Sequence, residues 1–462
     1  MKFRHLYTIL FLPICFVAES QDQAIRLIYD KLCTSLQLQQ GQIPRLEIST
    51  ASTTGASFSK KKYTIIIDQK LIESFDILKE FRNTAIAFVL GHELCHALDK
   101  DKNDTDFLAY DRSKGASYIN EQNADIQGAF LSYLSGYNCL PVMSEIIETI
   151  YATYKLGSVL SGYPSLNERI ESVLLVKEQV ESLIAIFKAA NLAMLSNNHE
   201  IAKKLFEKIL SYYPSPEVEN NAAINYILEA LNLGNYNNTN YIFPLEIDWE
   251  LRLSKPNLPL GQKELDPAIV SKRDLLLKQA EIKIKNMKEK YPHYSKAILQ
   301  LVTIKLLQQN TTYARSLLST IGFKSDEYYL LLSITDLMDN KKAAAQKNII
   351  KIKDSRLKIL AEKNIKNNSL EIPCNEIKFS LATKNSELLQ TKKLALDDIQ
   401  ISWSPADIQI KNGSKTMVFS LGSFSHGKCR PSKIYGNHEV WNSQIIGVSI
   451  ENSSNKQYYK YN

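Results

Sequence analysis

The sequence lacks several features that define common classes of protein. After the first twenty residues, no stretch reaches the roughly 18 consecutive apolar residues of a membrane-spanning helix, so we expect no transmembrane segment in the mature chain. No two cysteines form a CxxC pair, which argues against a cysteine-rich zinc knuckle. The net charge of +7 is modest for 462 residues and does not indicate binding to nucleic acid.

The first twenty residues have the pattern of a signal peptide. Lys2 and Arg4 precede an apolar run over residues 6–18, which is too short to span a bilayer. Small residues at the end of this run predict cleavage before Gln21. The mature protein is therefore expected to be exported, to the periplasm in a bacterium, with secretion as an alternative. Two further alternatives are lipid anchoring at Cys15 and an N-terminal core helix.

Cleavage would remove one of the six cysteines and leave five, so at least one thiol stays unpaired. An exported chain meets an oxidising compartment, where disulfides are allowed. Cys374 and Cys429 lie in the same C-terminal segment and are candidates for a disulfide, and Cys33 could pair with Cys139. Cys95 is expected to remain free.

Hydrophobic patterning divides the mature chain into three segments. Residues 21–176 mix helix and strand patterns. Residues 177–368 indicate helical hairpins that resemble tetratricopeptide repeats, with a generic helical bundle as the alternative. Residues 369–462 alternate apolar and polar residues, and Asn412-Gly413 predicts a hairpin there. The predicted fold class is therefore α+β, with a small β-rich C-terminal domain. Within the helical segment, residues 243–267 are proline-rich and indicate an excursion or a linker.

Histidine is scarce, and its placement is informative. Between Gln21 and Arg169 the only two histidines are His92 and His96, within the stretch "GHELCHALDK". Residues four apart lie on one face of a helix, so both imidazoles can reach one Zn²⁺ at about 2.0–2.1 Å. Glu93 lies between them, where it can take a proton from a water on the metal. An ordinary helix with two histidines is the competing interpretation.

A catalytic zinc site usually needs a third protein ligand. A third histidine six residues after His96 would indicate a metzincin, but Lys102 occupies that position. The stretch "EQNAD" instead offers Glu121, with Asp125 one helical turn later. Asp125 would accept a hydrogen bond from a ligand histidine and fix its orientation. Apolar residues follow Asp125, which favours a helix packed into the domain over a solvated acidic face.

These motifs resemble those of the HtpX-like and CAAX-prenyl-protease-like gluzincin metallopeptidases. The resemblance rests on "AFVLGHELCHALD", "NEQNADIQGAF" and "GYPSLNERIESV", and it covers residues 21–176. It implies a zinc metallopeptidase domain with one Zn²⁺ per chain, bound by His92, His96 and Glu121, and with Glu93 as the general base. "TGASFSKKKYTIII" resembles the family's edge strand, which lines the cleft and can pair with an extended substrate.

The sequence departs from the family pattern at two positions. The family has a histidine before the proline of the last motif, in a region that lies near the metal, whereas this chain has Tyr163. Arg169 is retained, and the resemblance makes it, like Tyr163, a candidate for supporting the metal ligands or the transition state. The Tyr163 hydroxyl could donate a hydrogen bond to an oxyanion, or the ring could be a structural aromatic. Cys95 replaces what is often a small residue, and its position on the helix predicts a buried side chain facing away from the metal.

The arrangement of a signal peptide, a peptidase domain and helical repeats resembles the periplasmic, BepA-like members of this family. The resemblance implies an exported zinc-dependent endopeptidase that acts in envelope protein quality control. Its partners would be unfolded or misassembled proteins and, through the repeats, the envelope assembly machinery. The alternative is a chaperone or scaffold that binds client proteins through its repeats and has a latent or inactive peptidase site.

Overall fold

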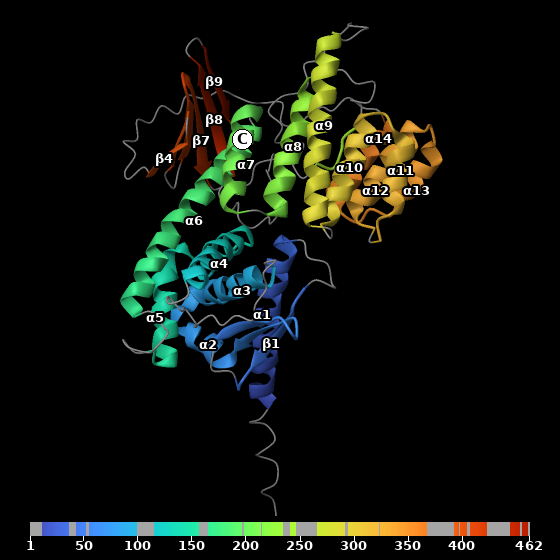
Figure 1. Ribbon diagram of the computed structural model, residues 1–462. Coiled ribbons are helices and arrows are strands. Elements are labelled where there is room, and N and C mark those ends of the chain that lie inside the picture. Colours follow the sequence, from blue (N-terminus) through green and yellow to red (C-terminus); the bar gives the residue numbers. More distant parts are fainter. Residues whose placement is uncertain are drawn as a thin grey trace, which may run out of the picture. The chain divides into compact units, whose positions relative to one another are not determined.

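The chain forms two compact units, residues 1–184 and 185–462 (Figure 1). The computed structural model describes residues 12–36, 43–51, 55–98, 115–156, 165–195, 198–213, 215–233, 241–245, 266–291, 294–322, 324–366, 392–396, 398–403, 407–422, 444–452 and 455–460. The domain boundaries predicted at residues 176 and 368 stay predictions.

The first unit contains a three-stranded sheet in the order β1-β3-β2. The central strand β3 (Thr64–Asp68) is almost entirely buried; it pairs in parallel with β1 (Arg45–Ser49) and antiparallel with β2 (Ala56–Ser59). Strand β2 is therefore at an edge of the sheet.

Helices pack around this sheet. They are α1 (Leu12–Ser35), α2 (Gln69–Ser74), the 3-10 helix η1 (Phe75–Phe81), α3 (Arg82–Leu98), α4 (Gly115–Leu134), the 3-10 turn η2 (Leu140–Val142) and α5 (Met143–Tyr154). Helix α3 begins at Arg82, because Lys79 adopts φ 50° and ψ −117° and interrupts the helical path between η1 and α3.

Helix α3 forms the centre of the first unit. It contacts α1, α4, β2 and β3, and nearly all its residues from Ala85 to Ala97 are buried. A helix that is apolar on all sides belongs in a core. The polar residues in its last two turns are therefore held in an apolar setting.

The second unit consists of helices followed by a sheet. Helix α6 (Leu166–Leu195) begins in the first unit and ends in the second. The others are α7 (His199–Tyr212), α8 (Pro216–Asn232), α9 (Pro267–Lys290), α10 (Ser295–Leu307), α11 (Thr311–Ser319), α12 (Asp326–Met338), α13 (Lys342–Ile349) and α14 (Ser355–Lys366). Helices α10 and α11 pack together, as do α12 and α13, while α10, α12 and α14 form a contacting row. Helical hairpins are thus present, and their assignment to tetratricopeptide repeats stays a prediction.

The C-terminal sheet is antiparallel, in the order β4-β5-β6-β7-β8-β9. Its strands are β4 (Lys392–Leu396), β5 (Ile399–Trp403), β6 (Asp407–Asn412), β7 (Lys415–Gly422), β8 (Gln444–Asn452) and β9 (Asn455–Lys460). The hairpin predicted at Asn412-Gly413 joins β6 to β7, and Gly413 adopts φ 57° in the turn. Helical units combined with these sheets agree with the predicted α+β class.

Two sequence predictions concern export and membranes. Helix α1 begins at Leu12 and passes through the expected cleavage position before Gln21, so the signal peptide stays a prediction. Among the residues that the structure describes, no helix combines the length and apolar character needed to cross a bilayer.

The predicted pairing of Cys33 with Cys139 is wrong. Each is a separate buried thiol, and burial raises the pKa of each to about 12. Cys33 packs with Tyr29 on the same helix. Cys374 and Cys429 lie outside the described residues.

Candidate metal centre

Helices α3 and α4 approach each other closely at two glycines. A β-carbon on Gly91 would lie 2.8 Å from the carbonyl oxygen of Gly128, and one on Gly128 would lie 2.6 Å from the amide nitrogen of His92. Any larger side chain at Gly128 would therefore push the backbones apart. The contact brings the polar first half of α4 against the last two turns of α3.

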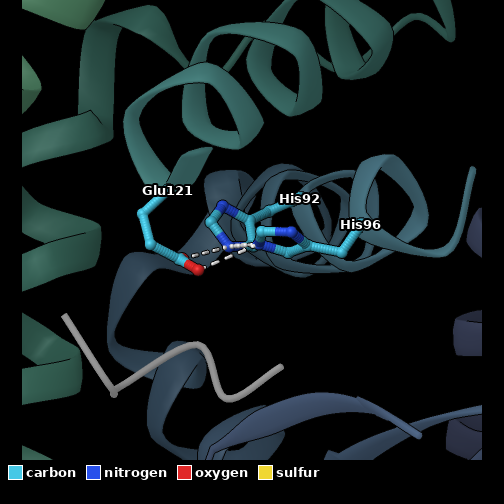
Figure 2. A group of neighbouring side chains, drawn as sticks. All are labelled: His92, His96 and Glu121. Atoms are coloured by element: carbon cyan, nitrogen blue, oxygen red, sulfur yellow. Dashed lines mark hydrogen bonds and ion pairs between the residues drawn. The ribbon is translucent and has the colours of Figure 1, made fainter. Parts of the chain in front are cut away.

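Three side chains meet beside this contact, as Figure 2 shows. His92 and His96 project from one face of α3, and Glu121 reaches them from α4. The Nε2 atoms of the two histidines are 3.0 Å apart. Oε2 of Glu121 lies 3.2 Å from His92 Nε2, and Oε1 lies 3.3 Å from His96 Nε2. All three residues are buried, and together they form a group able to hold a metal ion.

The spacing of these atoms fits a tetrahedral metal. Zinc ligands at about 2.0–2.1 Å from the ion stand about 3.3–3.4 Å apart at the corners of a tetrahedron. The two Nε2 atoms are 3.0 Å apart, and each lies 3.2–3.3 Å from a different oxygen of Glu121, so the separations within the group come close to this value. Both oxygens of Glu121 thus face imidazole nitrogens inside the protein. A buried carboxylate beside two imidazoles is well placed to bind a cation.

A second layer of polar side chains holds His92 in place. Oδ1 of Asp125 lies 2.9 Å from His92 Nδ1 and accepts its hydrogen bond. Arg169, at the start of α6, donates to both oxygens of Asp125, at 2.6 and 3.1 Å. With Nδ1–H committed to Asp125, Nε2 is the nitrogen of a neutral ring that is free to bind a metal.

Electrostatics at the site favour positive charge near the two carboxylates. Burial alone would lower the pKa of His92, but hydrogen bonds with Asp125 and Glu121 raise it to about 10. Burial opposes ionisation of Glu121 and Asp125 too. Hydrogen bonds from both histidines nevertheless lower the pKa of Glu121 to about 2, and the Arg169 charge together with His92 lowers that of Asp125 to about 2. A metal ion would replace the proton on His92.

Three further residues were candidates from the sequence: Glu93, Cys95 and Tyr163. Glu93 is fully buried on α3, next to His92 in the chain. Cys95 is a thiol outside any disulfide but is partly exposed, so the prediction of a buried side chain is wrong at that position. Tyr163 lies outside the described residues.

Two features of the site do not follow from motif spacing. The bidentate pairing of Arg169 with Asp125 joins residues 44 positions apart, whereas the sequence resemblance placed Arg169 only near the metal. The contact between Gly91 and Gly128 has a weak signal, a glycine inside each of two long helical patterns. Such glycines often mark a close backbone approach.

Comparison with known proteins brings no relative to light: the chain matches no protein-family model and no curated protein. The geometry described above shows a buried group that could hold one metal ion, and the resemblance to gluzincin peptidases stays an expectation from the short motifs.

Proposed function

We propose that the protein is a zinc-dependent endopeptidase of the gluzincin type, with His92, His96 and Glu121 as the zinc ligands. The observation that carries this proposal is the buried group of two imidazole nitrogens 3.0 Å apart, each 3.2–3.3 Å from an oxygen of the same carboxylate. Three protein ligands with the fourth corner open are the usual arrangement of a catalytic zinc, whereas structural zinc sites use four protein ligands.

The ligand types favour zinc over calcium or magnesium. Calcium and magnesium prefer oxygen ligands, while imidazole nitrogens suit zinc and its neighbouring transition metals. Zinc bound here would polarise a peptide carbonyl and lower the pKa of a water ligand. Asp125 and Arg169 would then hold the His92 ring in its orientation throughout the reaction.

In this proposal Glu93 moves the proton. Its carboxylate accepts one proton from the attacking water and delivers it to the nitrogen of the scissile bond, which leaves as an amine. Glu93 is fully buried beside a ligand histidine in the chain, where bulk water competes little for that proton. Tyr163 is a candidate donor of a hydrogen bond to the oxyanion.

The substrate would be an extended stretch of protein. Strand β2 forms an edge of the three-stranded sheet and contacts α3, the helix that carries the two histidines. An extended peptide could add to this edge through main-chain hydrogen bonds and lie near the metal. Unfolded or misassembled proteins of the cell envelope offer such segments, consistent with an exported protein that acts in quality control.

In the decisive experiment, the wild type and Glu93→Gln are each loaded with zinc, and their cleavage of an unfolded protein substrate is compared. We expect Glu93→Gln to bind one zinc per chain, measured by mass spectrometry of the metal, and to lose proteolysis at least a hundredfold. Glu80→Gln, at an exposed position before α3, is the matched control and should cleave normally. Unchanged cleavage by zinc-loaded Glu93→Gln would rule out the proposed role of Glu93.

The second candidate is a chaperone or scaffold with an inactive peptidase site. The stacked helical hairpins of the second unit favour it, because such stacks present long binding surfaces. Suppression of client aggregation by wild type and Glu93→Gln alike, with cleavage by neither, would support this candidate over the enzyme. Protein purified without metal, and unable to bind zinc, would also support it.

A further inference from the structure

The positive charge of the chain is concentrated in one short segment. Residues 341–366 cover α13, the turn after it and α14, and they contain nine basic and two acidic residues, a net charge of +7. The whole chain has 56 basic and 49 acidic residues and the same net charge of +7, so all its other residues balance at 47 of each. The excess charge therefore belongs to two short helices, drawn in orange in Figure 1.

Several of these basic side chains have no acidic partner. Four lysines are exposed and form no ion pair with any residue that the structure describes: Lys342, Lys347, Lys351 and Lys353. Lys341, by contrast, lies 3.5 Å from Asp339. Lys351 also lies over the ring of Tyr329, with its ammonium group 5.2 Å from the ring centroid. The ammonium groups of the four lysines are thus available to an anionic partner outside the chain.

Two isoleucines are exposed in the same segment. Ile350, between Lys347 and Lys351 in the chain, is 76% exposed, and Ile359 on α14 is 50% exposed. A single apolar side chain on a surface is ordinary. An isoleucine this exposed, with unpaired lysines before and after it, combines the two features that bind proteins to an anionic membrane surface: positive charge and an apolar group that enters the acyl boundary.

The turn between α13 and α14 is held firmly by the rest of the unit. Ile352 is buried, with 3% of its surface exposed. Asp326, the first residue of α12, accepts hydrogen bonds from the amides of Lys353 and Asp354 at 3.2 and 2.7 Å. Asp354 in turn accepts from the amide of Leu357 in α14 at 2.9 Å. Both carboxylates are bound to backbone amides, and the turn needs little ordering before it binds a partner.

The composition of the segment favours lipid over nucleic acid as the anionic partner. Surfaces that bind single-stranded nucleic acid combine positive charge with aromatic rings that stack on the bases, and arginine is the residue that binds phosphate in a bidentate manner. Residues 341–366 contain eight lysines, one arginine and no aromatic residue. Lysine contacts phosphate as a point charge, which suits phospholipid headgroups, and isoleucine suits the hydrocarbon beneath them.

We propose that α13, α14 and the turn between them form a docking surface for an anionic phospholipid bilayer, with the lysines at the headgroup phosphates and Ile350 at the boundary with the acyl chains. The surface goes beyond the proposed peptidase activity and uses none of the candidate metal ligands. Each lysine close to an anionic leaflet strengthens binding about fivefold, so the four unpaired lysines select anionic over zwitterionic lipid.

The first test measures binding of the full-length wild type to lipid vesicles by sedimentation. One set of vesicles contains phosphatidylcholine alone, and the other contains equal parts of phosphatidylcholine and phosphatidylglycerol. The ratio of the two affinities removes the contribution of the apolar residues 6–18, which would bind both sets alike. We expect at least tenfold tighter binding to the anionic vesicles, decreasing as sodium chloride rises to about 0.5 M. Absent or equal binding to the two sets would overturn the proposal.

The second test assigns the binding to this surface. Lys347→Gln, Lys351→Gln and Lys353→Gln together should weaken binding to the anionic vesicles at least tenfold. The matched control changes three exposed lysines of α9 that have acidic partners: Lys272→Gln, Lys285→Gln and Lys290→Gln. The control removes the same charge and should weaken binding by about threefold at most. An equal loss in both triple variants would assign the binding to overall charge and would overturn the proposal.

The third test separates lipid from nucleic acid. Ile350→Ser should weaken binding to the anionic vesicles at least threefold, because it removes the side chain that enters the acyl boundary. Ile77→Ser, at a position of the first unit that is 75% exposed, is the matched control and should bind as the wild type does. Binding of a single-stranded DNA oligonucleotide is measured in parallel by fluorescence anisotropy. Undiminished vesicle binding by Ile350→Ser would overturn the proposal, and tight binding of DNA by that variant would then assign the surface to nucleic acid.

Discussion

Gly128 on α4 lies directly against the backbone of His92 on α3, so close that a β-carbon there would be 2.6 Å from the His92 amide nitrogen. A real β-carbon essentially never lies so close to another heavy atom, and the His92 amide is part of the backbone and cannot rotate away. The three candidate metal ligands are thus brought together by a residue that has no side chain.

Gly128→Ala should separate α3 from α4 and spread the three ligands. We expect the free energy of unfolding to fall by about 1–3 kcal/mol, the usual cost of overpacking. Zinc affinity should fall at least tenfold, as measured by competition with a chelating dye. Gly322→Ala is the matched control, because a β-carbon there meets nothing within 4 Å; it should leave zinc binding unchanged. Wild-type zinc affinity in Gly128→Ala would contradict the importance of this contact.

Arg169→Met removes the only arginine that the described structure pairs with Asp125. The Asp125 carboxylate would then be buried without its guanidinium partner, which typically costs about 3–5 kcal/mol of folding stability. The double variant Asp125→Asn, Arg169→Met should lose less than the sum of the two single changes. Urea unfolding of all four proteins measures this coupling. Lys285→Met, which removes an exposed ion pair with Glu281, should cost about 0.5 kcal/mol or less.

His199 in the second unit is held in its neutral form. Oδ1 of Asn225 lies 2.9 Å from its Nδ1, and Nδ2 of Asn232 lies 2.9 Å from its Nε2. His199 donates its Nδ1–H to Oδ1 of Asn225, and its Nε2 accepts a hydrogen bond from Nδ2 of Asn232. A proton on Nε2 would break the second hydrogen bond. Burial lowers the pKa of His199, although the Asn225 hydrogen bond opposes that effect. The charged groups that face it are Glu229, Glu200 and Lys272.

This arrangement predicts a pH dependence of stability. The unfolded chain binds a proton on His199 more readily than the folded chain does. The contribution of His199 to the free energy of unfolding is therefore fully present above about pH 6.5 and decreases as the pH falls below that value. Urea unfolding of the wild type at pH 7.5 and 5.0 should show this decrease. His199→Gln keeps an amide that can replace the hydrogen bonds and should have a smaller difference between the two pH values. An equal difference in both proteins would assign the effect to other groups.

The described cysteines should differ in reactivity toward iodoacetamide. Burial raises the pKa of Cys33 and Cys139 to about 12, so almost no thiolate forms at neutral pH, whereas Cys95 is partly exposed. In the native protein we expect Cys95 to react first, and Cys33 and Cys139 only after urea is added. Peptide mass spectrometry identifies the alkylated positions. Equal alkylation of Cys95 and Cys139 without urea would contradict the burial of Cys139.

The sequence could predict that His92, His96 and Glu121 form a candidate metal site because the signals are local. Spacing of four residues fixes His92 and His96 on one helical face, and the same spacing links Glu121 to Asp125. That the two helices meet is a tertiary fact, which depends on the close approach at Gly91 and Gly128. From the sequence alone, the approach of α3 and α4 can be expected only through the resemblance of their motifs to those of a known family.

Other features have no periodic signal at all. Asn364 on α14 accepts from the amide and donates to the carbonyl of Ile242, 122 positions away, and Ile242 directly precedes the stretch that the pattern indicates only as a linker or excursion. The interruption at Lys79 escapes prediction for a different reason, because lysine is an ordinary helix former and its positive φ is imposed by the surrounding fold. The pairing of Cys33 with Cys139 fails because cysteine count and compartment permit a disulfide but do not fix which thiols meet.

Helix α6 starts at the ion pair between Arg169 and Asp125 and passes without a break from the first unit into the second. In chain order, His92, His96 and Glu121 all precede Arg169. The ion pair that supports His92 through Asp125 is therefore completed only after every candidate metal ligand has been synthesised.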